Sequence, residues 1–261
     1  MVKKREGKKE NYISKTEGNM ATVGIDLGTT NSLVSVWTDE GVKLIPNSFG
    51  EFLTPSIVNI SNGEVTVGKI AQERLITDPE NTFKEFKRHM GTKKEYWLKN
   101  RLKAYNAEDL SALVLRQLKL DAENYLGESV EEAIISVPAY FNDKQRNATR
   151  KAGRLAGFRV ERLINEPSAA AMAHRLGDMS RPSTYFIFDF GGGTLDVSIV
   201  EAFENIVEIQ AVAGDNMLGG KNFNEAIAMN FCKKNNLDPG YLSLESKAVI
   251  LRQAELCKIE L

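Results

Sequence analysis

The chain has 261 residues, near the length at which one hydrophobic core tends to divide into two. Its 34 basic and 35 acidic side chains give a net charge of −1, which argues against nucleic acid or an anionic membrane as a partner. No apolar run approaches the length of a membrane span. The only cysteines, Cys232 and Cys257, lack metal-ligand spacing, so we expect a cytoplasmic protein with reduced thiols.

The N-terminal part of the chain begins with a polar segment and continues with strands. Residues 1–20 are rich in lysine and lack the apolar stretch of a signal peptide, so we expect a disordered leader. Met20, directly before the first apolar segment, is an alternative start of the protein. Apolar residues and turn signals then predict strands over 21–27, 32–37 and 42–45, and shorter ones near 56–60 and 64–67.

The segment from Gly68 to Gly127 has mainly helical periodicity. Its clearest helix begins at Asn106, a residue suited to the N-cap, with Asp109 three residues later. Gly127 is placed to end that helix.

The remaining half of the chain alternates strands and helices. A buried strand over 133–137 precedes a helix that Asn142 and Gln145 open with a capping box and that runs to Gly157. A strand near 158–163 leads into a helix opened by Asn165-Glu166-Pro167, and polar residues 177–183 suggest a boundary. The pattern then predicts strands over 184–190, 194–201 and 205–213, and helices over about 220–236 and 243–261.

Two strand–turn–strand segments share the same chemistry. In each, an apolar strand ends at an aspartate, Asp26 or Asp189, and turns through glycine and threonine. Glycine lets backbone N–H groups approach an anion, and an aspartate at a strand end can hold a hydrated divalent cation. One such hairpin is weak support, because Asp-Gly turns join many ordinary strands. Two of them suggest a duplicated fold that holds a polyphosphate from both sides.

Six segments in order resemble the ATPase domain of the seventy-kilodalton heat-shock chaperone family, the DnaK-like proteins. They read GIDLGTTNS, NTFKEFKRHMG, ISVPAYFNDKQRNATRKAG, LINEPSAAAMAH, FDFGGGTLDVS and AGDNMLGG. The resemblance covers residues 21–261, and the segments TNSLVSVW and LIPNSFGEFLTPSIV are closest in character to the bacterial HscC branch.

The resemblance implies an α/β protein with an actin-like, ribonuclease H-like ATPase fold. Two lobes, each a mixed β-sheet flanked by helices, would hold nucleotide in the cleft between them. We expect lobe I over 21–182 and part of lobe II over 183–261. The last helix keeps its apolar spacing up to Leu261 without a capping signal, so we expect lobe II to be incomplete. The adenosine motif and the peptide-binding domain would then also be missing.

The resemblance also implies the ligands, ATP or ADP with Mg²⁺, and the residues that bind them. Asp26, Asp189 and Asp196 would hold the metal mainly through water, although aspartates can also merely shape turns. The expected nucleotide-binding residues are Gly28, Thr29, Thr30, Asn31, Gly191, Gly192, Gly193, Thr194, Gly214, Gly219, Gly220, Glu255 and Lys258. Gly214, Gly219 and Gly220 resemble a third glycine turn, although Gly220 also suits a helix start.

The catalytic residues implied by the resemblance are Lys87, Glu166, Asp26 and Asp189. Lys87 would place the attacking water and stabilise γ-phosphate charge, because phosphoryl transfer depends on positioning and electrostatics. Glu166 would help to orient that water. Without the family, Lys87 is one of several surface lysines on a helix.

Other positions match the family less closely or carry a second interpretation. Pro138 and Arg146 match a relay from the ATP site to the surface, although proline often simply ends a strand. Lys221 and Asn222 stand where the family has acidic residues, and Ile259 stands where it has an arginine that stacks on adenine.

The function that follows is the ATP-binding and ATP-hydrolysing domain of a chaperone that couples nucleotide state to client-peptide binding. A J-domain co-chaperone and a nucleotide-exchange factor are implied as partners, with clients bound only through a domain absent from this sequence. Because contacts to adenosine would be missing, we expect the ATPase activity of this chain to be impaired, and the sequence alone does not decide whether it hydrolyses ATP. The alternatives are a non-catalytic nucleotide- or protein-binding fragment and, less well matched, a small-molecule kinase of the same superfamily.

Overall fold

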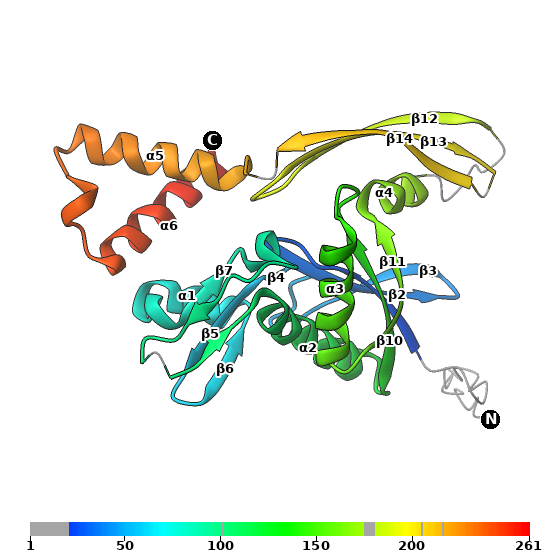
Figure 1. Ribbon diagram of the computed structural model, residues 1–261, viewed down its shortest axis with the longest axis horizontal. Helices are drawn as coiled ribbons and strands as arrows, with labels where there is room; N and C mark the ends of the chain where they lie inside the picture. Colours follow the sequence, from blue (N-terminus) through cyan, green and yellow to red (C-terminus); the bar gives the residue numbers. More distant parts are fainter. Residues whose placement is uncertain (1–20, 101, 175–180, 205, 216) are drawn as a thin grey trace, which may run out of the picture.

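The computed structural model describes residues 21–261 apart from 101, 175–180, 205 and 216 (Figure 1). The expected leader over 1–20 therefore lies outside the described residues, as does most of the proposed boundary over 177–183. Within the described part of the chain, no helix has the length and apolar character needed to cross a membrane.

The larger part of the molecule is built on one mixed sheet. Its strand order is β11-β10-β1-β2-β3, and the short strand β4 also pairs with β2, outside this order. Strands β11, β10 and β1 run parallel, whereas β1, β2 and β3 form an antiparallel meander. The strands are β1 (Ala21–Asp26), β2 (Asn31–Thr38), β3 (Gly41–Ile45), β4 (Thr54–Pro55), β10 (Val130–Val137) and β11 (Arg159–Asn165). The turn between β1 and β2 therefore lies at the centre of the sheet.

Helices α2 (Ala107–Leu126) and α3 (Asp143–Leu155) pack against each other and against this sheet (Figure 1). The capping box predicted for Asn106 and Asp109 is confirmed, and so is the glycine end of α2 at Gly127. The capping box that opens α3 at Asn142 is confirmed as well. The two capping boxes were readable because each pairs side chains with orphan backbone N–H groups three residues away.

The core beneath the mixed sheet combines strand and helix side chains. Val23, Ile25 and Leu27 from the β1 segment are almost completely buried, as are Leu110 and Leu118 from α2. A rigid apolar base of this kind fixes the end of β1, where Asp26 and the first glycine turn lie.

The prediction of mainly helical structure from Gly68 to Gly127 is wrong between the two helices of that segment. Only α1 (Lys69–Thr77) and α2 are α-helices. Between them lie short elements: η1 (Pro79–Asn81), β7 (Thr82–Lys84), η2 (Phe86–His89), β8 (Tyr96–Trp97) and β9 (Ala104–Tyr105). Pro79 starts a new turn, and Glu85 has a left-handed backbone with φ of 58°, which prevents a continuous helix.

Strand β7 joins β5 (Ile57–Ser61) and β6 (Glu64–Val67) in a small sheet of order β6-β5-β7. Helix α1 packs on this small sheet. One residue after β7 begins η2, in which Phe86 and Lys87 are buried.

The C-terminal part contains a second sheet and a helical pair. The antiparallel order is β12-β13-β14, formed by β12 (Ser183–Phe190), β13 (Leu195–Phe203) and β14 (Ile206–Asp215). Helix α4 (Glu166–His174) lies between the two sheets (Figure 1). Val200 and Ala202 are buried, but Phe186 and Phe188 are 69% and 60% exposed. One face of this sheet is therefore covered and the other is largely open.

The chain then forms α5 (Gly220–Lys234), η3 (Pro239–Tyr241) and α6 (Leu244–Glu260). Helices α5 and α6 pack against each other, and α6 also contacts α1 of the N-terminal part (Figure 1). The predicted strand and helix ranges of this region agree with the structure to within about two residues.

Candidate functional site

A pocket of about 290 Å³ lies where the two glycine turns meet. Its walls come from β1–β2, η2, the β10–α3 connection, α4 and the β12–β13 turn. The lining residues are Asp26, Gly28, Thr29, Thr30, Asn31, Lys87, Arg88, His89, Pro138, Tyr140, Phe141, Gln145, Glu166, Asp189, Gly191, Gly192, Gly193, Thr194 and Met217.

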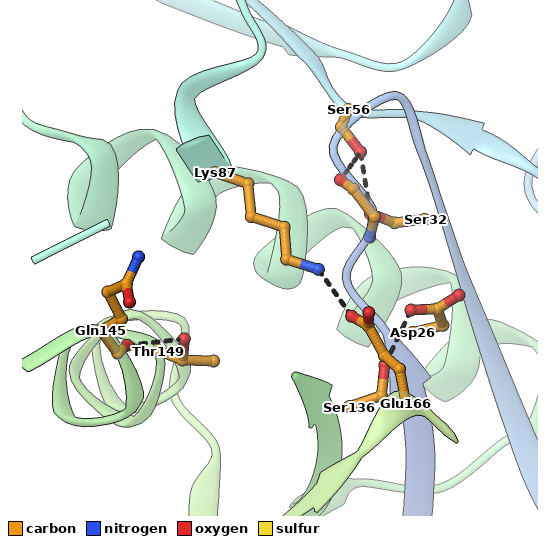
Figure 2. A network of polar contacts seen from close by, with 9 residues as sticks. Asp26, Ser32, Ser56, Lys87, Ser136, Gln145, Thr149 and Glu166 are labelled. Carbon is orange, nitrogen blue, oxygen red and sulfur yellow. Dashed lines mark hydrogen bonds and ion pairs between the residues drawn. The ribbon is translucent and has the colours of Figure 1, made fainter. Parts of the chain in front are cut away.

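The first glycine turn is held by two serines that are each 1% exposed, Ser32 and Ser56. The Gly28 N–H donates to Ser32 Oγ at 3.2 Å, the two hydroxyl oxygens are 2.9 Å apart, and Ser56 Oγ–H donates to Gly28 O at 2.8 Å (Figure 2). Because each hydroxyl has one hydrogen, Ser32 must donate to Ser56. These bonds form a closed ring that starts and ends at Gly28.

The same support fixes the direction of the peptide groups in this turn. The Ser56 N–H donates to Thr30 O at 2.8 Å, so the carbonyls of Gly28 and Thr30 both point toward Ser56. In a planar trans peptide the following N–H points the opposite way. The N–H groups of Thr29 and Asn31 are therefore turned away from the serines.

The second glycine turn has its carbonyls held in a similar way, but by different partners. Gly220 N–H donates to Gly191 O at 3.0 Å, and Lys221 N–H donates to Gly192 O at 2.8 Å. The Arg88 guanidinium donates to Gly193 O. The three N–H groups that follow these carbonyls are thus turned away from α5 and Arg88.

The two turns come into contact with each other. A Cβ at Gly192 would lie 2.1 Å from Thr30 Oγ1, and one at Gly193 would lie 2.9 Å from Thr29 Cγ2. Side chains at these positions would push the turns apart, so glycine is required for the close approach.

Lys87 and Glu166 form a buried ion pair on one wall of the pocket. Lys87 Nζ is 2.8 Å from Glu166 Oε1, and the two side chains are 8% and 18% exposed (Figure 2). Burial acts to lower the pKa of Lys87, but Glu166, Asp26 and Asp189 outweigh it and raise that pKa. Lys87 is therefore a held ammonium, and the alternative interpretation of a surface lysine on a helix is wrong.

Acidic side chains gather beside this ammonium. Asp26 Oδ1 accepts from Ser136 Oγ at 2.7 Å (Figure 2). Asp189 and Asp196 are directly paired across β12 and β13, which puts two like charges on the same face of the hairpin. Burial raises the pKa of Asp189, and Asp26 adds to that shift.

Asp196 carries a buried carboxylate oxygen whose hydrogen-bonding capacity is not used. Its side chain is 9% exposed, and its Oδ1 atom is buried without a hydrogen-bond partner. Burial, then Glu166 and Asp189, raise the pKa of Asp196 to about 6. A buried carboxylate with an orphan oxygen among other carboxylates fits a site that receives a cation.

The structure brings together many of the predicted site residues and leaves others apart. Asp26, Lys87, Glu166, Asp189 and the two turns, residues 28–31 and 191–194, line the pocket. Gly219 and Gly220 lie behind the second turn, next to Gly193 and Gly192. Gly214 lies within strand β14 rather than in a turn, and Asp196 lies one strand away from the wall.

Glu255 and Lys258, which the resemblance also implies as nucleotide-binding residues, make their contacts outside the pocket wall. Glu255 pairs with Arg252 at 2.9 Å on the same helix. Lys258 Nζ donates to Gly220 O at 3.2 Å, at the start of α5. Neither lines the pocket.

Several pocket residues were missed by sequence reasoning. Arg88, His89, Tyr140, Phe141 and Gln145 also line the pocket. Arg88 follows Lys87 directly, so its position in the same turn was a usable signal. The buried serines that hold the first turn gave no comparable signal, because serine is common in exposed loops.

Arg146 holds the pocket wall in place. Its guanidinium donates to Phe141 O at 2.8 Å and to Asn165 Oδ1 at 2.8 Å. It therefore ties the segment after Pro138, which lines the pocket, to the residue just before Glu166. This geometry is compatible with the relay predicted for Pro138 and Arg146, which stays a prediction.

Comparison with known protein families gives a match over nearly all of the described chain. Residues 22–261 match the family described as Hsp70 protein. The match includes every predicted site residue and nearly the whole described chain.

Proposed function

The chain belongs to the Hsp70 protein family, and we propose that its pocket binds ATP or ADP with Mg²⁺ and hydrolyses the γ-phosphate. The predicted family is confirmed, and with it the actin-like ATPase fold, seen here as mixed α/β sheets with helices. Family membership identifies a nucleotide-binding domain of the chaperone type. The affinity to the HscC branch stays a prediction.

The observation that carries the proposal is the orientation of the peptide groups in both turns. Carbonyls of residues 28, 30, 191, 192 and 193 are bonded to surrounding scaffold, so the N–H groups that follow them are the polar groups left for a ligand. Successive free N–H groups form an anion-binding concavity. Two such turns in contact suit a chain of phosphates bound from both sides.

Lys87 and Glu166 supply the groups for the chemical step. The Lys87 ammonium is held in a poorly solvated position, where its charge acts more strongly on a γ-phosphate than it would in water. Glu166 holds that ammonium in place and offers a second carboxylate oxygen to orient a water molecule.

Asp26, Asp189 and Asp196 are our proposed Mg²⁺ residues. The described residues contain no group of three or more His, Cys, Asp or Glu side chains placed to ligate one metal ion together. We therefore propose contact mainly through water, which suits Mg²⁺ because it gives up its hydration shell reluctantly. Bound Mg²⁺ would neutralise charge on the phosphates. The orphan Oδ1 of Asp196 supports this assignment.

The wider biological role belongs to the same proposal. By family, the nucleotide state of this domain would control client-peptide binding through a separate domain, with a J-domain co-chaperone and a nucleotide-exchange factor as partners. We propose that the protein acts in the cytoplasm in the stress response and protein folding.

The test is ATP turnover and ADP affinity, measured with and without Mg²⁺. We expect Lys87→Met to lower turnover at least about 100-fold while ADP still binds, because positioning and charge stabilisation are lost. Lys84→Met is the matched control, since Lys84 lies in the same segment but is exposed. Glu166→Gln keeps the shape of the ion pair and should also reduce turnover. It provides the test if Lys87→Met folds poorly.

Two results would contradict the proposal. Absence of nucleotide binding by the unmodified chain would overturn it entirely. Binding of ADP without any ATP turnover would instead support the non-catalytic alternative.

A further inference from the structure

Glu85 joins the two sides of the pocket although it does not line the pocket itself. Its Oε2 atom is 2.7 Å from Lys221 Nζ and 3.5 Å from Arg88 Nη1. Glu85 and Arg88 belong to the segment after β7, whereas Lys221 is in the first turn of α5. One carboxylate therefore links two segments that are far apart in the sequence.

The two cations that Glu85 holds also support the second glycine turn. The Arg88 guanidinium donates to Gly193 O, and the Lys221 backbone N–H donates to Gly192 O at 2.8 Å. A closed path therefore runs from Glu85 through Arg88 to the turn, then through Lys221 back to Glu85. Removing the carboxylate would open this path at both cations.

The side chains of these ion pairs are less exposed than those of an ordinary surface pair. The Arg88 side chain is only 6% exposed, and those of Glu85 and Lys221 are 25% and 26% exposed. Partial exclusion of water reduces screening, which usually weakens exposed pairs. Glu85 also has a left-handed backbone with φ of 58°, a conformation that residues other than glycine seldom adopt.

We propose that Glu85 is a positioning residue for the phosphate-binding turn over 191–194. Acting through Arg88 and Lys221, it keeps that turn close to the turn over 28–31 and thereby slows the release of bound nucleotide. This inference rests on the proposed function, since it concerns the same pocket. Lys221 stands where the resemblance implies an acidic residue, so the Glu85–Lys221 pair is a feature of this chain.

The experiment is a double-mutant cycle on the release rate of a fluorescent ADP analogue from the full chain. We expect release to be about tenfold faster in Glu85→Gln and about threefold faster in Lys221→Gln, the scale of one charge-assisted hydrogen bond. Because Glu85 acts through Lys221, the double variant should release no faster than Glu85→Gln alone. Unchanged release in Glu85→Gln, or independent effects that multiply to about thirtyfold, would overturn the proposal.

A second readout separates positioning from general damage to the fold. In Glu85→Gln, single-turnover hydrolysis of bound ATP should slow by a smaller factor than release accelerates, because the Lys87–Glu166 pair is untouched. If faster release came with a similar slowing of hydrolysis and a lower melting temperature, Glu85 would have a general structural role. That result would contradict the proposal. Glu80→Gln with Lys99→Gln removes an exposed ion pair elsewhere and should change none of these quantities.

A nucleotide-free measurement keeps this inference distinct from the proposed function. Spin labels at the exposed positions Glu161 and Glu225, with both cysteines replaced by alanine, report the separation of the N-terminal part from α5. Glu85→Gln should broaden this distance distribution even if the unmodified chain binds no nucleotide. An unchanged distribution would contradict the proposal, whereas failure of nucleotide binding alone would contradict only the proposed function.

Discussion

Both glycine turns have their backbone carbonyls held by hydrogen bonds, but the hydrogen-bond partners differ. The first turn, over 28–31, is held by neutral hydrogen bonds from Ser32 and Ser56, both nearly inaccessible to water. The second, over 191–194, is held by the start of α5 and by Arg88 from a different part of the chain. The first turn is therefore an internal property of the mixed sheet, and the second depends on how separate segments are placed.

The residues that precede the first turn are also more deeply buried than those that precede the second. Val23 and Ile25, which precede the first turn, are 0% and 2% exposed. Phe188 and Phe190, which precede the second, are 60% and 41% exposed. A turn on a closed core has little freedom, whereas a turn on a thin, half-covered sheet can move with its neighbours. We infer that adjustment of the pocket occurs mainly on the second side.

The largest expected effect comes from adding a methyl group to the first turn at Gly28. A Cβ at Gly28 would lie 2.0 Å from Asn31 O, so Gly28→Ala should lower ADP affinity more than about 100-fold. Gly191→Ala is the matched control in the other turn, because its nearest contact would be an ordinary 3.6 Å to Thr194 O. Calorimetric titration measures both, and equal losses would show that the turns do not differ in this way.

The next effect concerns the serine ring. Ser56→Ala removes the donor to Gly28 O and leaves the Ser32 hydroxyl without its acceptor, so unfolding should become easier by about 1–3 kcal/mol. Chemical denaturation should register this change together with weaker nucleotide binding. Ser48→Ala, at an exposed site, should leave both unchanged. A loss of binding without a loss of stability would mean that the ring is not part of the core.

A smaller effect should appear as salt dependence. Raising the ionic strength from about 0.05 to 0.5 M screens partly exposed ion pairs but not buried neutral hydrogen bonds. ADP release should accelerate severalfold in the unmodified chain and much less in Glu85→Gln, measured by stopped-flow fluorescence. If the ADP release rate changed equally with ionic strength in both proteins, the ion pairs of Glu85 would not be what holds the second turn.

The smallest effect is a change of stability with pH at Asp121 in α2. Burial raises the pKa of Asp121 above its ordinary value, so the folded protein binds this proton more readily than the unfolded chain. Stability therefore falls as the pH rises through the range between the ordinary and the folded pKa. Asp121→Asn should be more stable by up to about 1 kcal/mol near pH 7 and equal near pH 3.

Urea unfolding at the two pH values measures this difference, with Asp39→Asn at an exposed turn as the control. A difference of the same size at both pH values would assign the effect to packing rather than to ionisation.

Sequence patterns predicted the parts of the fold that depend on nearby residues. The capping boxes at Asn106 and Asn142 and the two turns bounded by Asp26 and Asp189 were readable because all partners lie within a few positions. The position of Lys87 could not be predicted in this way. The helical periodicity over Gly68–Gly127 gave no sign of the short strand and the 3₁₀ turn that place it.

The remaining parts of the site depend on contacts between distant segments. Ser56 reaches the first turn from β4–β5, and Lys221 reaches Glu85 from the first turn of α5. Neither serine nor lysine carries a local signal of such a partner. Family resemblance supplied Lys87 and Glu166, but it could not supply the Glu85–Lys221 pair, at which this chain departs from the family pattern.

The pairing of Asp189 with Asp196 ties the chemistry of the pocket to strand alignment. Side chains in a strand alternate between faces, so shifting β13 by one residue against β12 would send Asp196 to the opposite face. Such a shift would disperse the acidic cluster without altering any of its members. Under the proposed function, the register of the two strands therefore matters as much as the identity of the two aspartates.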